Sequence, residues 1–274
     1  KMLHNGIEYA EMQILAEAYN ILRAAGFDNV AASEFFDNLK KEQQSSYLIE
    51  ITSSILNTQK DGAYLIDKIK PIANHKGTGK LTVETGLNYG FPLPSIFEAF
   101  NARVESNYQK IWPTTTKNIK IELNPIELQE AIYFSRLSTL TQGILFIEYF
   151  SKRENLEIKI EDVMQNWLEG CIIRSDLLKE IKSFLKDSPP NKSIVESKQI
   201  QKNLDSRIKN TKNLVSHCIE NNIPTPVMYS SLNWYTNSSS EFNPSSLIQA
   251  QRDYFGAHTV QLHESDEFLH LNWD

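Results

Sequence analysis

Apolar residues recur at three- and four-residue steps through most of the chain, which is the pattern of amphipathic helices packed on a core. The clearest run covers residues 5–25, and Gly26 is a suitable helix end. Alternation that is typical of strands is limited to residues 119–124 and 258–263. The pattern therefore predicts an all-α protein.

Two proline-containing stretches indicate where later helices begin. Asn124 has the residue type of an N-cap, Pro125 suits the first helical position, and Glu127 would complete a capping box. A long helix should follow. Asn243 and Pro244 predict another helix start of the same kind.

The chain also shows weak self-similarity. Residues 90–108 and 222–240 each contain a Pro-x-Pro that opens a predicted helix. Two related helical halves, 1–122 and 123–257, followed by a tail at 258–274, would explain this parallel. Chance similarity between amphipathic helices would explain it too, so both interpretations stay open.

Composition narrows the class of protein. The 274 residues are 41% hydrophobic, which is enough for a large core, and a net charge of −6 argues against a nucleic-acid-binding surface. Cys171 and Cys218 form neither a disulfide framework nor a zinc spacing, so we expect a reduced, cytoplasmic setting. We expect no membrane span and no signal peptide. The first residue is not Met, which suggests a piece of a longer protein.

The first predicted helix carries an unusual polar face. Lys1, His4, Asn5, Glu8 and Tyr9 fall within one sector at 100° per residue. A solvated face is usually built from Glu, Lys, Gln and Arg, whereas these groups transfer protons and orient hydroxyls. An ordinary exposed stripe is the competing interpretation.

Residues 75–82, HKGTGKLT, have the composition of a phosphate-binding turn. Lys76, Thr78 and Lys80 supply cations and a hydroxyl, and the glycines free backbone donors. The spacing is not that of a P-loop, and a flexible basic turn would look the same.

A third cluster, QRDYFGAHT, holds Arg252 and His258 on either side of an aromatic pair. Arginine recognises phosphate or carboxylate with a forked geometry, although Asp253 could pair with Arg252 instead. Arg103 alone would be interpreted as a surface residue.

Taken together, these stretches resemble a known family. KMLHNGIEYAEMQILAEAY, HKGTGKLT, WLEGCIIRSDLLKEI and SLIQAQRDYFGAHT, in this order, are similar to the C-terminal helical domain of the 6-phosphogluconate dehydrogenase family. The resemblance runs from Lys1 to about Trp273. It implies an internally duplicated all-α domain for residues 1–274, which binds substrate and dimerises. The family's N-terminal Rossmann domain would lie outside this chain, since no GxGxxG fingerprint is present.

The resemblance implies NADP-dependent oxidative decarboxylation of 6-phosphogluconate to ribulose 5-phosphate and CO2, without a metal. Lys1 would be the general base and Glu8 the acid that protonates carbon. Substrate would be bound by the remaining residues of the motifs: His4, Asn5, Tyr9, Lys76, Thr78, Arg103, Arg252 and His258. Lys76, rather than Lys80, matches the family's binding lysine.

The same resemblance implies a homodimer in which Arg252 and His258 complete the partner's site. NADP would be bound mainly by the domain outside this chain. Two alternatives stay open: a related β-hydroxyacid dehydrogenase domain for another sugar acid, and a helical dimerisation module without chemistry of its own.

Overall fold

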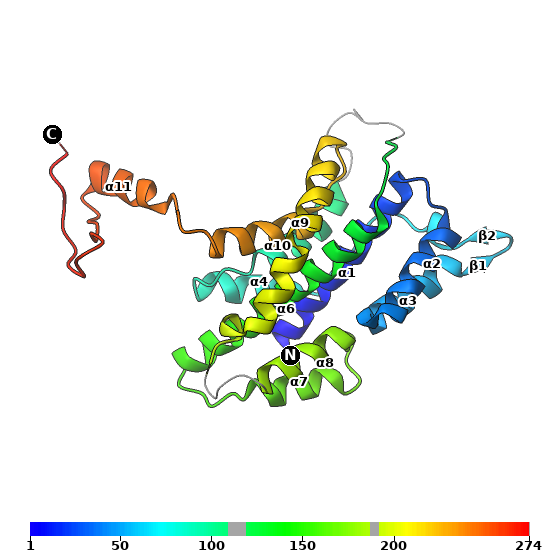
Figure 1. Ribbon diagram of the computed structural model, residues 1–274, viewed down its shortest axis with the longest axis horizontal. Helices are drawn as coiled ribbons and strands as arrows, with labels where there is room; N and C mark the ends of the chain where they lie inside the picture. Colours follow the sequence, from blue (N-terminus) through cyan, green and yellow to red (C-terminus); the bar gives the residue numbers. More distant parts are fainter. Residues whose placement is uncertain (109–118, 187–191, 274) are drawn as a thin grey trace. The chain divides into compact units, whose positions relative to one another are not determined.

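The computed structural model describes residues 1–108, 119–186 and 192–273. In this part of the chain, helices follow one another with short connections, and paired strands occur only in one two-stranded hairpin. The predicted all-α class is confirmed (Figure 1).

The elements have the following bounds. The α-helices are α1 (Met2–Ala24), α2 (Asn29–Leu39), α3 (Tyr47–Asn57), α4 (Thr78–Asn88), α5 (Pro94–Glu105), α6 (Pro125–Arg153), α7 (Ile160–Leu168), α8 (Asp176–Lys186), α9 (Lys198–Glu220), α10 (Pro226–Ser238) and α11 (Ser245–Gly256). The short helical turns are η1 (Lys40–Gln44), η2 (Ile66–Lys68), η3 (Ser106–Tyr108) and η4 (Ile194–Glu196). The strands are β1 (Gln59–Lys60) and β2 (Ala63–Tyr64).

The start of α6 follows the sequence signals with one exception. The Asn124 side chain accepts a hydrogen bond from the Ile126 backbone N–H at 3.1 Å, and Pro125 is the first helical residue. Glu127 does not close the expected capping box, because its carboxylate accepts a hydrogen bond from Asn213 of α9 at 3.0 Å. A contact between helices therefore replaces the local one.

Both strand predictions are wrong. Residues 119–124 form no strand, and residues 258–263 contribute only an isolated bridge between Val260 and Leu269. The hairpin β1–β2 turns through the Asp-Gly pair at 61–62, where φ is +54° and +75°. An Asp-Gly pair suits such a turn because both central residues must adopt the left-handed region.

The chain divides into two compact units, and each is described by itself. Unit 1 comprises Lys1–Asn233 and unit 2 comprises Trp234–Asp274, so the division falls within α10. Pro94 opens α5 and Pro226 opens α10, as the repeated Pro-x-Pro predicts. The duplication into halves stays a prediction.

Helix α6 is the centre of unit 1. It packs against α1 and α9 and is buried through most of its length (Figure 1). A helix that is apolar or buried on nearly all sides belongs in a core rather than on a surface. At Gly143 the approach is close, since a Cβ there would lie 2.6 Å from Ile7 Cδ1 of α1.

Two polar contacts also fix α1 within the core. Glu11 of α1 pairs with Arg136 of α6 at 2.6 Å, and both side chains are almost completely buried. Glu17 accepts hydrogen bonds from the first N–H groups of α10, those of Val227 and Met228, at 2.9 and 3.0 Å. The helix that carries the candidate site is thus held by both α6 and α10.

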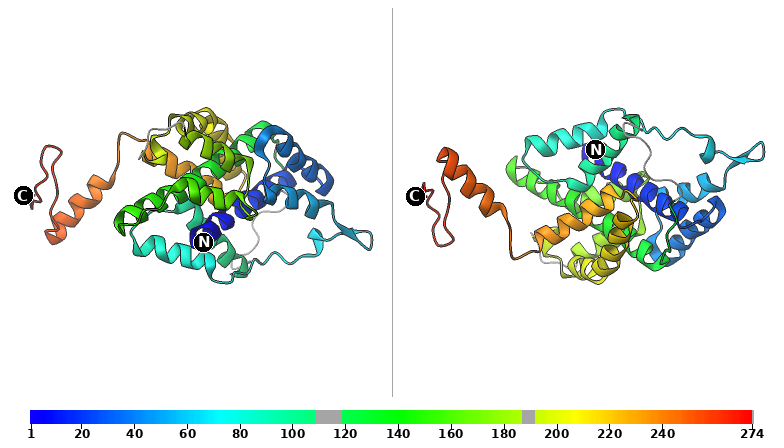
Figure 2. Two further views of the ribbon diagram at one scale, coloured as in Figure 1. Left: turned by 90° about the horizontal axis from the view of Figure 1, so that it is seen from below. Right: turned by 90° about the horizontal axis from the view of Figure 1, so that it is seen from above.

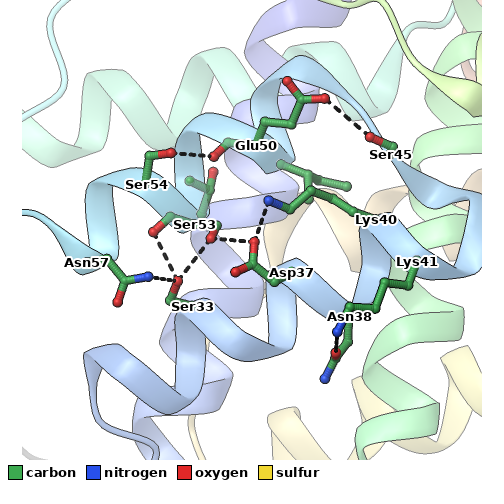
Figure 3. Close-up of polar contacts among 12 residues, drawn as sticks. Ser33, Asp37, Asn38, Lys40, Lys41, Ser45, Glu50, Ser53, Ser54 and Asn57 are labelled. Carbon is green, nitrogen blue, oxygen red and sulfur yellow. Dashed lines mark hydrogen bonds and ion pairs between the residues drawn. The ribbon is translucent and has the colours of Figure 1, made fainter.

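Helices α2 and α3 are joined by a polar network (Figure 3). Ser33 donates to the Ser53 carbonyl at 3.0 Å and receives the Asn57 amide at 2.6 Å, while Ser53 donates to Asp37 at 2.6 Å. Lys40 pairs with Asp37, and hydrogen bonds from Lys40 and Ser53 lower the pKa of that carboxyl. Ser33 and Ser53 are buried, whereas the Asp37 side chain is 41% exposed, and hydrogen bonds of this kind between two helices are typical of a structural joint.

Candidate active site

The polar face predicted on the first helix is present on α1. Lys1 is the exposed N-cap, and the His4 imidazole follows one turn later, with Nδ1 at 3.2 Å from the Asn5 amide oxygen. The same Nδ1 lies 4.0 Å from Glu8 Oε2, and the Glu8 side chain is 20% exposed. One strip of α1 therefore carries an amine, an imidazole, an amide and a carboxylate.

Tyr9 does not lie on this strip as an open phenol. Its side chain is buried, and the Arg103 guanidinium stacks on its ring at 3.5 Å from the centroid. Burial lowers the pKa of Arg103, while the charges of Tyr9 and Glu8 oppose that shift. Arg103 is therefore a partly buried cation beside the Glu8 carboxylate, not the isolated surface arginine that its local sequence suggests.

Helices α1 and α4 pack against each other (Figure 2). Two glycines allow this close contact. A Cβ at Gly6 would lie 2.5 Å from Thr82 Cγ2, and a Cβ at Gly79 would lie 2.3 Å from the Tyr9 ring. The Thr82 hydroxyl also donates to the Met2 carbonyl at 3.0 Å. Gly6 of the HNGIEY motif and Gly79 of the GTGK motif thus serve helix packing.

This contact places the basic turn beside the α1 strip. Gly77 has a φ of +93° and precedes α4, Thr78 is its first residue, and Lys76 and Thr78 are exposed. The free N–H groups and the dipole of a helix start favour an anion, so a cation and a hydroxyl here suit a phosphate. Lys80 is paired with Glu84 at 3.2 Å, which supports the preference for Lys76.

A pocket of about 230 Å³ opens next to Lys1. Apart from Lys1 it is lined by apolar side chains of α1, α6 and α7 and by Ile158: Met2, Leu3, Phe146, Ile147, Phe150, Val163 and Trp167. Trp167 also meets the His4 ring edge to face, with centroids 6.3 Å apart. The sequence gives no sign that Trp167 belongs to the site, because Trp167 and His4 are far apart along the chain and only the fold brings them together.

Arg252 and His258 belong to unit 2, and both are exposed. Arg252 donates to the Gln249 side chain at 2.9 Å. Asp253 does not pair with Arg252, as considered from the sequence, but accepts a hydrogen bond from the Thr259 N–H at 2.8 Å.

Within residues 1–108, 119–186 and 192–273, no cluster of three or more His, Cys, Asp or Glu side chains could hold a metal ion. None of the described helices combines the length and apolar character needed to cross a membrane.

The site thus combines ionisable side chains on α1 with a cationic turn at the start of α4, which packs against it. The family of 6-phosphogluconate dehydrogenase C-terminal domains matches residues 1–273. The chain belongs to this family, which confirms the resemblance.

Individual relatives of the chain belong to the same family. The decarboxylating 6-phosphogluconate dehydrogenases of Ceratitis capitata and Lactococcus lactis subsp. lactis are each 34% identical over the whole chain. The chain spans 59% and 60% of their lengths. A solved 6-phosphogluconate dehydrogenase of Plasmodium falciparum, described as apo, with its cofactor NADP⁺ and with its substrate 6-phosphogluconate, superposes with a TM-score of 0.91 at 31% identity. That match covers all of this chain and 62% of the other.

Proposed function

We propose that the chain is the substrate-binding and dimerisation domain of an enzyme that oxidatively decarboxylates 6-phosphogluconate to ribulose 5-phosphate and CO2. The observation that carries the proposal is the close α1–α4 contact, because it brings the acid–base strip and the cationic turn to one place. A reaction that moves protons on a phosphorylated sugar acid needs both.

Within that reaction, Lys1 takes the proton of the substrate's 3-hydroxyl and returns it to the carbonyl oxygen as CO2 leaves. Glu8 protonates the C1 carbon of the enediol, and His4 and Asn5 orient the hydroxyls and the carboxylate. The contact of 4.0 Å between His4 and Glu8 keeps these groups within one substrate length.

The remaining residues of unit 1 hold the anionic groups. Lys76 and Thr78 suit the phosphate at the start of α4. Arg103 is held flat on Tyr9, so its free edge is fixed and less conformational entropy is lost when it binds an anion. These roles follow the family resemblance, and the packing supports them.

NADP, when bound, accepts the hydride. The described residues contain no parallel β-α-β unit, which is the usual binding site of a dinucleotide. We therefore assign NADP binding mainly to polypeptide outside this chain. The chain's own contribution is to bind and orient the sugar acid and to move its protons.

We further propose a homodimer in which Arg252 and His258 reach the partner's site. Unit 2 exposes large apolar side chains, Leu247, Ile248, Tyr254, Phe255 and Phe268 among them, each more than half exposed. Such a surface on a unit of 41 residues favours burial against another chain.

The two cysteines are free, which favours a reduced cytoplasmic location.

The test is an assay of the full-length protein with 6-phosphogluconate and NADP, in which absorbance measures the reduction of NADP. Lys1→Met should lower kcat by about 10²–10⁴-fold, the usual contribution of a proton-transfer group. Lys76→Met should raise KM, whereas the matched control Lys80→Met should leave both constants unchanged. Activity on a non-phosphorylated sugar acid alone would support a related dehydrogenase, and no activity from folded dimer would favour an inert module.

A further inference from the structure

One amide side chain in unit 2 contacts both regions assigned to substrate binding. Gln249 accepts a hydrogen bond from Arg252 Nη1 at 2.9 Å through its Oε1. Its Nε2 donates to the Thr259 carbonyl, next to His258, at 2.6 Å. A guanidinium can only donate and a carbonyl can only accept, so the orientation of the amide is determined by its two partners.

The backbone around His258 needs such support. Ala257 and Thr259, its two neighbours, have φ values of +49° and +62°, a region that residues other than glycine rarely adopt. A Cβ at position 256 would lie 2.8 Å from His258 Nε2, so a side chain there would displace the imidazole. His258 is therefore presented by a turn whose conformation must be held from outside.

Asp253 supplies the second support. Its carbonyl accepts the Ala257 N–H at 2.9 Å, and its buried carboxylate accepts the Thr259 N–H at 2.8 Å. The carboxylate also accepts hydrogen bonds from His270, Leu271 and Trp273, each at 3.0 Å. Asp253 fixes the turn, but it does not contact Arg252. Gln249 is the group that joins the turn to the guanidinium.

We propose that Gln249 is a positioning residue that holds Arg252 and His258 as one anion-binding pair. This inference rests on the proposed function, in which these two side chains bind the phosphorylated sugar acid. Without Gln249 the guanidinium would lose its hydrogen-bond partner on α11 and would rotate freely on a long side chain. Substrate would then have to order it at the moment of binding, which weakens affinity and leaves the chemical step unaffected.

The experiment uses steady-state kinetics of the full-length enzyme. Gln249→Met keeps the length of the side chain and removes both hydrogen bonds. It should raise KM for 6-phosphogluconate about tenfold with kcat unchanged, the effect of losing one hydrogen bond to a charged group. Gln251→Met, an exposed amide on the same helix, is the matched control and should leave both constants unchanged.

A double variant separates positioning from simple support of the fold. If Gln249 acts through Arg252, then Gln249→Met should raise KM less in the Arg252→Ala background than in the wild type, and the effect that remains comes from the His258 turn. Full additivity, an unchanged KM in Gln249→Met, or a parallel loss of kcat and thermal stability would each overturn the inference.

The proposed function can fail separately. Wild-type enzyme that does not reduce NADP with 6-phosphogluconate would refute that function, and the inference with it. Active wild type with an unchanged KM in Arg252→Ala would leave the activity intact and refute the pairing of Gln249 with a substrate ligand.

Discussion

The buried ion pair between α1 and α6 gives a sharp test of how the core is held. Arg136 is 1% exposed and Glu11 is 3% exposed, and they meet through a single contact from Nε to Oε2 of 2.6 Å. Arg136 also donates to the Gln44 carbonyl at 3.3 Å. One Arg136 nitrogen and one Glu11 oxygen have no hydrogen-bond partner, so the pair is incompletely compensated.

Arg136→Met would leave the Glu11 carboxylate in the core without its cation. Breaking one side of a buried pair costs about 3–5 kcal/mol, because the remaining charge is not solvated. At roughly 2–4 °C per kcal/mol for a unit of this size, the melting temperature should fall by about 6–20 °C.

Urea unfolding of the 274-residue chain, followed by circular dichroism, measures the effect. The matched control is Lys80→Met, which breaks the exposed pair with Glu84 and should cost less than about 1 kcal/mol. Glu11→Met combined with Arg136→Met removes both charges and should recover most of the loss. If Arg136→Met costs no more than Lys80→Met, or if the double variant is worse than the single one, the reasoning is refuted.

Three further predictions concern single side chains. Burial raises the pKa of Glu17 to about 7 from 4.5, against the hydrogen bonds from α10. The raised pKa contributes to the free energy of unfolding fully below about pH 4.5, and this contribution is lost as the pH rises through 7. Glu17→Gln should therefore flatten the pH profile of urea unfolding by about 3 kcal/mol. Gly79→Ala should overpack the Tyr9 ring and cost about 1–3 kcal/mol by thermal unfolding, whereas Lys80→Ala on the next exposed position should be neutral. Asn124→Ala removes the N-cap of α6 and should cost about 1 kcal/mol in urea, and an unchanged midpoint would mean that water replaces the cap.

Local signals explain which parts of the fold the sequence predicts. The first helix was expected over residues 5–25 and occurs as Met2–Ala24, and Asn124 caps α6 as expected, because periodicity and caps act within a few residues. Glu127 departs from its prediction because its partner, Asn213, is far along the chain. The pairing of Glu11 with Arg136 could not be read from the sequence for the same reason.

The candidate site shows the same division. Spacing on one helix placed Lys1, His4 and Glu8 on a common face, and the structure has them there. The stacking of Arg103 on Tyr9 depends on how α5 meets α1, which no local pattern encodes. The sequence explained the glycines of residues 75–82 as a means of freeing backbone donors, whereas the packing of Gly79 on the Tyr9 ring follows only from the contact between α1 and α4.

The hydrogen bonds of Asp253 have a practical consequence for handling the protein. Leu271 and Trp273 close the network that also fixes Thr259, so the last described residues take part in presenting His258. Loss of Trp273 would remove one donor to Asp253 and loosen a turn more than ten residues away. A shortened variant that is meant to keep the His258 turn should therefore retain residues 271–273.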